Sequence, residues 1–146
     1  MARAAISLGY EFVVLTDHSH YLRDGRLEAQ WEEIEEVAAR LAPFRVLRGV
    51  EANIRADGTV DVPDELLARL DWVVASLHTS FDRSPTERIL SAIDNPHVDC
   101  IGHLTGRRLS RAARLDGAPV DVDRVVARAA ETRTALEINA QPDRLD

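Results

Sequence analysis

Residues 11–18, Glu-Phe-Val-Val-Leu-Thr-Asp-His, carry an apolar, β-rich segment directly into an aspartate and a histidine. A helix is expected next, over residues 27–41, because apolar residues recur there at helical spacing and glutamates fill the opposite face. Residues 45–54, Arg-Val-Leu-Arg-Gly-Val-Glu-Ala-Asn-Ile, have the composition of a second strand. A strand, a helix and a strand in this order predict a βαβ unit with parallel strands.

The same alternation continues to the end of the chain. Further strands are expected at residues 71–77, 98–102 and 134–138, where apolar runs are typical of strands covered on both faces. The helices expected between them begin at Pro63, at a capping box formed by Ser84 and Glu87, and at Asp121, the last with Val122, Val125, Val126 and Ala129 facing inward. The predicted class is α/β with a parallel sheet.

The chain is expected to be one domain, residues 1–146, that forms part of a parallel-stranded barrel. A complete (β/α) barrel needs roughly 200–250 residues, and this chain has 146. Residues 2–8 have the pattern of a helix that ends at Gly9, and no helix is expected after the strand at 134–138. We therefore expect a partial barrel, a fragment without the first and last strands.

The composition excludes several classes of protein. The chain has 25 acidic and 18 basic residues and a net charge of −7, which argues against a broad nucleic-acid-coating surface. Every basic residue is arginine, which excludes a lysine Schiff base and a P-loop lysine. No apolar stretch reaches the ~20 residues of a membrane span. The single cysteine, Cys100, excludes a disulfide framework and a Cys-rich zinc site, and we expect a cytoplasmic protein with no membrane partner.

Ionisable or polar side chains stand at the carboxyl end of every expected strand. They are Asp17 and His18, then Glu51, His78, His103 and finally Asn139. In parallel α/β folds these ends converge on one rim, where catalytic residues gather. Three imidazoles and a carboxylate form a ligand set for Zn, Mn or Fe, and metals held in this way activate water for hydrolysis. The pattern predicts a hydrolytic metal site.

Each of these residues also has a structural interpretation. His18 can belong to a turn that Asp17 stabilises, and Asp17 itself is expected to orient a neighbouring ligand rather than to bind metal. Glu51 would be costly to bury unpaired in an apolar strand, and an ion pair with Arg48 is the alternative to a metal. His20 forms an H-x-H pair with His18, but it enters an expected loop and is not counted as a ligand. Asp17 and Glu51 are the candidate catalytic residues.

An arginine-rich loop follows His103. Guanidinium groups bind phosphate bidentately, and four of them, on Arg107, Arg108, Arg111 and Arg114, fall within eight residues here. We take Arg107 and Arg108, together with Asn139 at the rim, as candidate substrate contacts. The alternative is a solvated loop face.

Together these residues resemble the PHP (polymerase and histidinol phosphatase) metallo-phosphoesterases, and above all the PHP domain at the C-terminus of bacterial family X DNA polymerases. The resemblance extends over nearly the whole chain and rests on residues 8–19, 47–54, 57–67, 73–78, 95–107 and 134–146. It implies a fragment of a distorted (β/α)7 barrel with a two- or three-metal cluster of Zn, Mn or Fe. The ligands it implies are His18, Glu51, His78 and His103, with Glu51 bridging two metals.

The function implied by the resemblance is metal-dependent phosphoester hydrolysis, in particular 3′-5′ exonuclease and 3′-end processing activity of the kind used in DNA repair. The implied partners are a DNA 3′ end or another phosphoester, and a family X polymerase domain on the same full-length chain. Two alternatives stay open: a small-molecule phosphatase of the histidinol-phosphate type, and a catalytically inactive fragment. The second arises because the family's H-x-H pair on the first strand and its D-x-H pair near the end are absent from this sequence.

Overall fold

The computed structural model describes residues 1–110 and 114–146. Its framework is a parallel sheet whose strands follow one another in chain order, β1-β2-β3-β4-β5. The strands are β1 (Phe12–Leu15), β2 (Arg45–Asn53), β3 (Trp72–Ser76), β4 (Cys100–Ile101) and β5 (Ala135–Leu136), and every pairing is parallel. The α/β class and the parallel sheet predicted from the sequence are confirmed.

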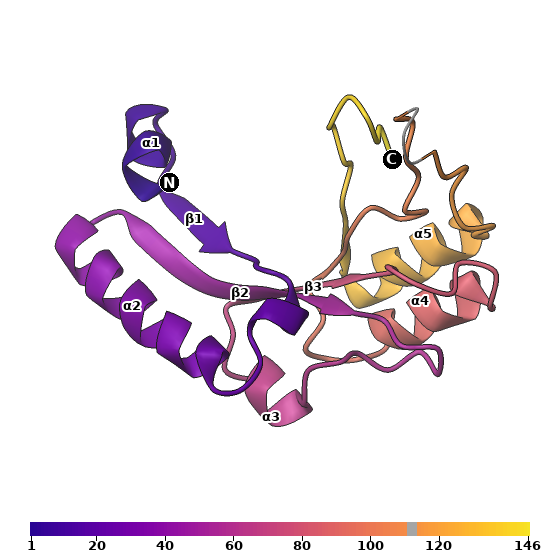
Figure 1. Cartoon of the computed structure of the whole chain (residues 1–146), viewed down its shortest axis with the longest axis horizontal. Helices are drawn as coiled ribbons and strands as arrows, with labels where there is room; N and C mark the ends of the chain where they lie inside the picture. The colour runs from indigo at the N-terminus through magenta and orange to yellow at the C-terminus, as the bar shows by residue number, and fades with distance from the viewer. Residues whose placement is uncertain (111–113) are drawn as a thin grey trace.

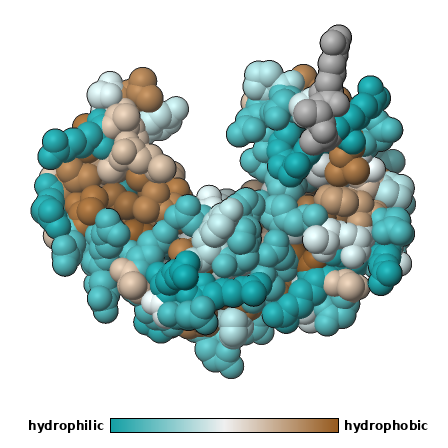
Figure 2. Space-filling view, in the orientation of Figure 1, coloured by the Kyte–Doolittle hydropathy of each residue, from teal (hydrophilic) through white to brown (hydrophobic). Residues whose placement is uncertain are grey.

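The helices are α1 (Ala2–Ser7), the short 3-10 helix η1 (Ser19–Tyr21), α2 (Arg26–Leu41), α3 (Asp64–Leu67), α4 (Pro85–Ile93) and α5 (Val122–Thr132). Apart from α1, which precedes β1, the helices connect the strands, and α2, α4 and α5 cover the outer side of the sheet (Figure 1). Because the crossovers run over the same side, the sheet bends into an open partial barrel, and a hollow lies between the two arms of the molecule (Figure 2). In the part of the chain that the structure describes, no helix is long and apolar enough to cross a membrane.

The larger of two cores lies between the middle of the sheet and the helices α3, α4 and α5. Val50, Val73 and Ile101, from three neighbouring strands, are at most 1% exposed and belong to the same cluster as Ile89 of α4 and Val125 of α5. This cluster fixes the spacing of β2, β3 and β4, and therefore of the loops that leave their carboxyl ends.

The smaller core lies beneath α2. Ile34 of that helix packs against Phe44 and Val46 at the start of β2, and partly buried residues of α1 and β1 complete the cluster. Apolar side chains remain exposed on this arm, where Leu8 is 75% and Phe12 is 52% exposed. Figure 2 shows the apolar surface on the arm that carries α1.

The expected capping box of α4 is wrong. Ser84 has φ 43° and ψ 51°, in the left-handed region, and its side chain makes no capping hydrogen bond. The carboxylate of Glu87 instead lies 2.7 Å from the guanidinium of Arg124 on α5. Glu87 therefore forms an ion pair between α4 and α5 instead of the capping contact that the local sequence pattern predicts.

The inward face of α5 is narrower than expected. Val125 and Ala129 are buried, whereas Val122 and Val126 are 45% and 47% exposed. The last strand is also shorter than expected, since β5 contains two residues and Ile138 is 90% exposed. Both differences occur because the described residues place no further layer against this side of the helix or against the end of the strand.

Candidate metal centre

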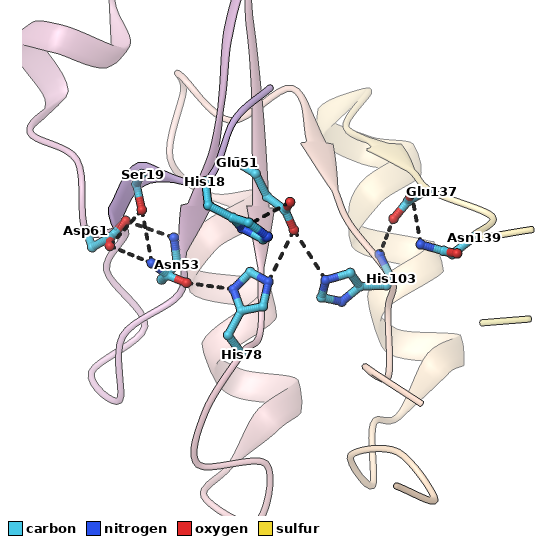
Figure 3. Close-up of polar contacts among 9 residues, drawn as sticks. All are labelled: His18, Ser19, Glu51, Asn53, Asp61, His78, His103, Glu137 and Asn139. Carbon is cyan, nitrogen blue, oxygen red and sulfur yellow. Dashed lines mark hydrogen bonds and ion pairs between the residues drawn. The ribbon is translucent and has the colours of Figure 1, made fainter. Parts of the chain in front are cut away.

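The carboxylate of Glu51 lies at the centre of three imidazole rings (Figure 3). Its Oε2 is 3.3 Å from Nδ1 of His18, and its Oε1 is 3.3 Å from Nε2 of His78 and from Nε2 of His103. The ring of His78 lies edge-on to the other two, with centroid distances of 4.9 Å to His18 and 5.0 Å to His103. The structure thus brings all four predicted ligands together.

The register of the parallel sheet explains this convergence. The N–H of Glu51 on β2 donates to the carbonyl of Asp17 at 3.0 Å, and a bridge beyond the end of β1 places His18 beside Glu51. His78 lies two residues after the end of β3, and His103 lies two residues after the end of β4. The carboxyl ends of neighbouring parallel strands meet at one edge, so residues that are far apart in sequence lie around one carboxylate.

The protonation states at this point are set by burial and by the neighbouring rings. Burial raises the pKa of the Glu51 carboxyl, but interactions with His103, His78, Ser76 and His18 together outweigh it and hold that pKa far below its ordinary range. Burial lowers the pKa of the His18 imidazole, and the attraction of Glu51 opposes this only in part. At neutral pH the site therefore offers a carboxylate and a neutral ring at position 18, which are the forms that bind metals.

The donor atoms fit a divalent metal ion. One ligand atom from each of His18, Glu51 and His78 lies within 4.8 Å of the others. In the described part of the chain, Nδ1 of His18 and Nε2 of His78, which both face Glu51, are buried without a hydrogen-bond partner. Such atoms are costly to leave unsatisfied, and imidazole and carboxylate ligands suit Zn, Mn and Fe. The donor set supports a metal cofactor and does not select among these three ions.

A polar network holds His78 from the side opposite Glu51. Nδ1 of His78 is 2.6 Å from Oδ1 of Asn53, whose amide nitrogen donates to Asp61 at 2.7 Å and to Ser19 at 3.0 Å (Figure 3). Asn53 follows Glu51 by two positions on β2, so the two side chains point to the same face of the sheet.

His103 is held through its main chain. Its N–H donates to Oε2 of Glu137 at 2.6 Å, and Nδ2 of Asn139 donates to the other oxygen of Glu137 at 3.4 Å. The φ of His103 is 23°, which is uncommon for a residue with a side chain. A Cβ on the preceding Gly102 would collide with Oγ of Ser76. The tight backbone at this point directs the imidazole toward Glu51.

Two sequence alternatives have clear outcomes in the structure. Arg48 does not pair with Glu51; its guanidinium lies 3.5 Å from the carboxylate of Asp71. The carboxylate of Asp17 points away from the imidazoles and accepts a hydrogen bond of 2.6 Å from Gln30 on α2. Asp17 therefore contacts the cluster through its carbonyl, not through its carboxylate.

Of the predicted arginines, Arg108 and Arg114 line a cavity that also reaches His103. The N–H of Arg107 donates to Asp146 at 3.1 Å, and Arg108 is exposed. The guanidinium of Arg114 pairs with Asp116 at 3.0 Å. Arg111 lies outside the described residues.

A cavity of about 540 Å³ opens beside the cluster, on the inner face of the sheet. His18, Glu51 and His103 form one part of its wall, and Asn139 and Arg144 of the C-terminal segment form another. A second cavity of about 300 Å³ also reaches His103 and is lined by Arg108 and Arg144. Arg144, which the sequence reasoning did not select, is thus a cation common to both cavities.

Cys100 also lines the larger cavity, and it is mostly buried. Burial, and to a lesser degree the carboxylates of Glu137 and Asp99, raise the pKa of its thiol to about 11. The side chain is therefore a neutral thiol at physiological pH and packs as a small apolar residue.

The sequence reasoning also missed the residues that support the ligands. Glu137 interrupts an apolar strand, which is the same signal that identified Glu51. Asn53 stands at the end of its strand as the ligands do, but its connection to Ser19 and Asp61 joins residues 34 and 8 positions away and depends on the fold. No local pattern identifies that connection.

The chain is similar in sequence to several known proteins. The chain is 43% identical to the DNA polymerase/3′-5′ exonuclease PolX of Bacillus subtilis (strain 168) over 155 aligned positions, which cover 100% of this chain and 27% of PolX. It is 33% identical to a probable phosphatase of Caldanaerobacter subterraneus subsp. tengcongensis, covering 94% of this chain and 54% of that protein. It is 35% identical to a probable phosphatase of Thermoanaerobacter sp. (strain X514), covering 94% and 56%. No protein-family model matches the chain.

The chain therefore spans about a quarter of PolX and little more than half of each phosphatase. The similarity includes almost all of the chain, and with it the strand ends that bear the histidines and Glu51. The matches confirm the resemblance seen in the motifs: this chain is related to the PHP phosphoesterases and to the corresponding part of the bacterial family X DNA polymerases.

Proposed function

We propose that this chain provides a metal-dependent phosphoesterase centre. The observation that carries the proposal is the arrangement of His18, His78 and His103 around the single carboxylate of Glu51, at the wall of an open cavity. Zn, Mn or Fe ions bound by these residues, as a cluster of two or three in the complete site, supply Lewis acidity that activates water toward phosphorus. The compartment we propose is the cytoplasm, where the buried thiol of Cys100 stays reduced.

The chain's own residues have separate tasks in this proposal. The three imidazoles and Glu51 would hold the ions, and Glu51 presents its two oxygens to different rings. Asp17 positions Glu51 through the hydrogen bond from the Glu51 N–H to its carbonyl. Arg107, Arg108 and Asn139 are the proposed substrate contacts; Asn139 lines the larger cavity and Arg108 the smaller one, and Arg144 adds a positive charge common to both.

For the substrate we propose a phosphoester at a DNA 3′ end, with a polymerase domain on a longer version of the chain. The support is the similarity at 43% identity to a protein named a 3′-5′ exonuclease as well as a DNA polymerase. The second candidate is a small phosphomonoester, which the relatives named probable phosphatases and the net charge of −7 favour.

The first test measures whether metal and activity depend on the predicted ligands. The dialysed 146-residue chain is expected to retain Zn, Mn or Fe by elemental mass spectrometry. His78→Ala should lower metal content and lower phosphoester hydrolysis by at least about 100-fold, the upper end of what loss of an outer-shell partner costs. His97→Ala is the matched control, because His97 is also half-buried but follows α4, far from the cluster in the fold. Equal metal content in wild type and His78→Ala would contradict the proposed ligand.

The second test separates the two substrates. Wild-type protein is assayed side by side on 3′-recessed DNA and on histidinol phosphate, with Arg108→Ala as the variant. Faster turnover of DNA supports the 3′-end proposal, and faster turnover of histidinol phosphate assigns the site to small phosphomonoesters. A folded chain that binds no metal and hydrolyses neither substrate would support the third hypothesis, an inactive fragment.

A further inference from the structure

The amide of Asn53 lies between His78 and the half-buried carboxylate of Asp61, and its orientation determines which group faces the imidazole. Its nitrogen Nδ2 lies 2.7 Å from Oδ2 of Asp61 and 3.0 Å from Oγ of Ser19. Its oxygen Oδ1 lies 2.6 Å from Nδ1 of His78. The three residues Ser19, Asn53 and Asp61, which we call the Asn53 relay, are buried or half-buried.

The direction of this amide follows from the chemistry of its neighbours. An ionised carboxylate only accepts hydrogen bonds, so the amide group that faces Asp61 must be the NH₂. The hydroxyl of Ser19 donates to the same Asp61 oxygen at 2.9 Å, which leaves its lone pairs for the amide of Asn53. The second oxygen of Asp61 accepts the main-chain N–H of Asn53 at 2.8 Å and fixes the carboxylate in turn. The carbonyl of Asn53 therefore faces His78.

A carbonyl oxygen 2.6 Å from a ring nitrogen requires a proton between them. If Nδ1 of His78 carries that proton, its other nitrogen, Nε2, presents a lone pair to the Glu51 oxygen at 3.3 Å. Two acceptors then face each other with no proton in between, and a cation is what this space accommodates. The opposite tautomer places a lone pair against the Asn53 oxygen at the much shorter distance.

We propose that the Asn53 relay keeps the proton of His78 on Nδ1 and thereby makes Nε2 the metal-binding nitrogen. Asn53 and Asp61 are thus positioning residues, which act on the metal through His78 and touch neither metal nor substrate. The proposal rests on the proposed function for the identity of the ligand, but the location of the proton is a property of the chain alone. His103, whose Nδ1 has no partner among the described residues, has no such relay.

Asp61→Asn tests the Asn53 relay because it replaces a carboxylate oxygen, which accepts hydrogen bonds, by an NH₂ group, which donates them. The shape of the side chain hardly changes. An amide at position 61 presents its own NH₂ to Asn53, so the amide of Asn53 is expected to rotate and turn its nitrogen toward His78. The proton of His78 then moves to Nε2, where it competes with the metal. Asn53→Asp combined with Asp61→Asn exchanges the two groups, and it should return the proton to Nδ1. Asp57→Asn is the matched control, since Asp57 is a fully exposed carboxylate on the same loop and bonds only to Thr59 among its side-chain neighbours.

Two readouts follow the relay in the 146-residue chain. Long-range ¹H–¹⁵N spectra at about pH 8 distinguish protonated from unprotonated ring nitrogens of His78 in the metal-free protein. Isothermal titration with Zn²⁺ measures the dissociation constant, which we expect to increase about 10- to 100-fold in Asp61→Asn and to recover in the double variant. Asp57→Asn should behave as wild type in both.

The outcomes separate the relay from the proposed function. A proton on Nδ1 of wild-type His78 that leaves in Asp61→Asn supports the relay, even if no metal binds and the proposed function fails. An unprotonated Nδ1 in the wild-type chain overturns the relay, and this measurement does not depend on any variant folding. Zn²⁺ affinity that is the same in wild type, Asp61→Asn and the double variant also overturns it, while the metal site itself stands.

Discussion

The two arms of the molecule differ in how firmly each holds its share of the site. The cluster around β2, β3 and β4 contains seventeen buried apolar residues in the described chain, whereas the cluster beneath α2 contains three. Glu51, His78 and His103 come from the larger unit, and His18 alone comes from β1 in the smaller one. The site therefore joins a more firmly packed part, which carries three of the proposed ligands, to a less firmly packed part, which carries the fourth.

This difference indicates how the site would fail. Regions with few buried contacts open at lower free energy than the global unfolding of the chain. Separation of β1 from β2 would remove His18 from Glu51 and draw Ser19 away from the Asn53 relay. His78 and His103 would keep their backbone positions, because these depend on β3 and β4. The metal centre should thus lose His18 first, and the following variants test this comparison from the largest effect to the smallest.

Truncation of one residue in each core gives the largest effects and distinguishes the two arms. Ile89→Ala, in the larger core, should reduce the free energy of unfolding by about 2–5 kcal/mol, because Ile89 is fully buried and the cavity cannot close. Ile34→Ala, in the smaller core, should cause a local opening instead. Hydrogen exchange is then expected to increase in β1 and α2 while protection of β3 is retained, and denaturant titration gives the global values.

The comparison between the arms would be broken by one result in particular. If Ile34→Ala increases exchange in β1, β3 and β4 to the same extent, the chain unfolds as one unit and His18 is no more easily lost than the other ligands. Val126→Ala is the control, since that side chain is 47% exposed and its loss should change the free energy of unfolding by less than about 0.5 kcal/mol.

A buried arginine explains why the larger unit holds its loops so firmly. Arg88 of α4 is 3% exposed, and its guanidinium donates to the carbonyls of Ile54 and Arg55 after β2 and of Thr79 and Ser80 after β3. These carbonyls lie next to the segments that carry Asn53 and His78. One side chain therefore ties together the two loops on which the site depends.

Arg88→Lys keeps the positive charge but removes the planar fork that reaches four carbonyls. We expect it to reduce the free energy of unfolding by about 1.5–3 kcal/mol, the range for hydrogen bonds to a charged group. Zn²⁺ binding measured by calorimetry should weaken in parallel, because the loop with His78 is released. Unchanged Zn²⁺ affinity in a destabilised Arg88→Lys protein would show that the loops keep their positions without this residue, and Arg83→Lys on the exposed part of the same loop is the control.

Both the order of the elements and the candidate ligands could be predicted from the sequence, because both depend on recognising where strands end. Strand ends are marked locally, by an apolar run that stops at a charged or imidazole side chain, and the parallel sheet then brings such ends together without any further information. Residues that act through other residues carry no such mark. Arg88 has the pattern of an ordinary position on an amphipathic helix, and Asp61 follows a turn. Their partners lie 8 to 42 positions away in the chain.

The helix ends also show that a local sequence pattern does not identify every contact. Asp121 caps α5, since its side chain accepts the N–H of Arg124 at 3.2 Å, whereas Ser84 caps nothing despite the favourable pattern of its neighbours. Asp121→Ala should therefore reduce the free energy of unfolding by about 1 kcal/mol. Ser84→Ala should reduce the free energy of unfolding by far less, because no capping hydrogen bond is lost, and the left-handed backbone at Ser84 is strained with either side chain.

Thermal and denaturant unfolding of the two variants measures the difference in the free energy of unfolding. Equal losses would mean that Ser84 caps α4 in solution. Since Asp121 and Ser84 both lie in the larger unit, neither variant should change hydrogen exchange in β1, so this effect stays separate from the opening of the weaker arm.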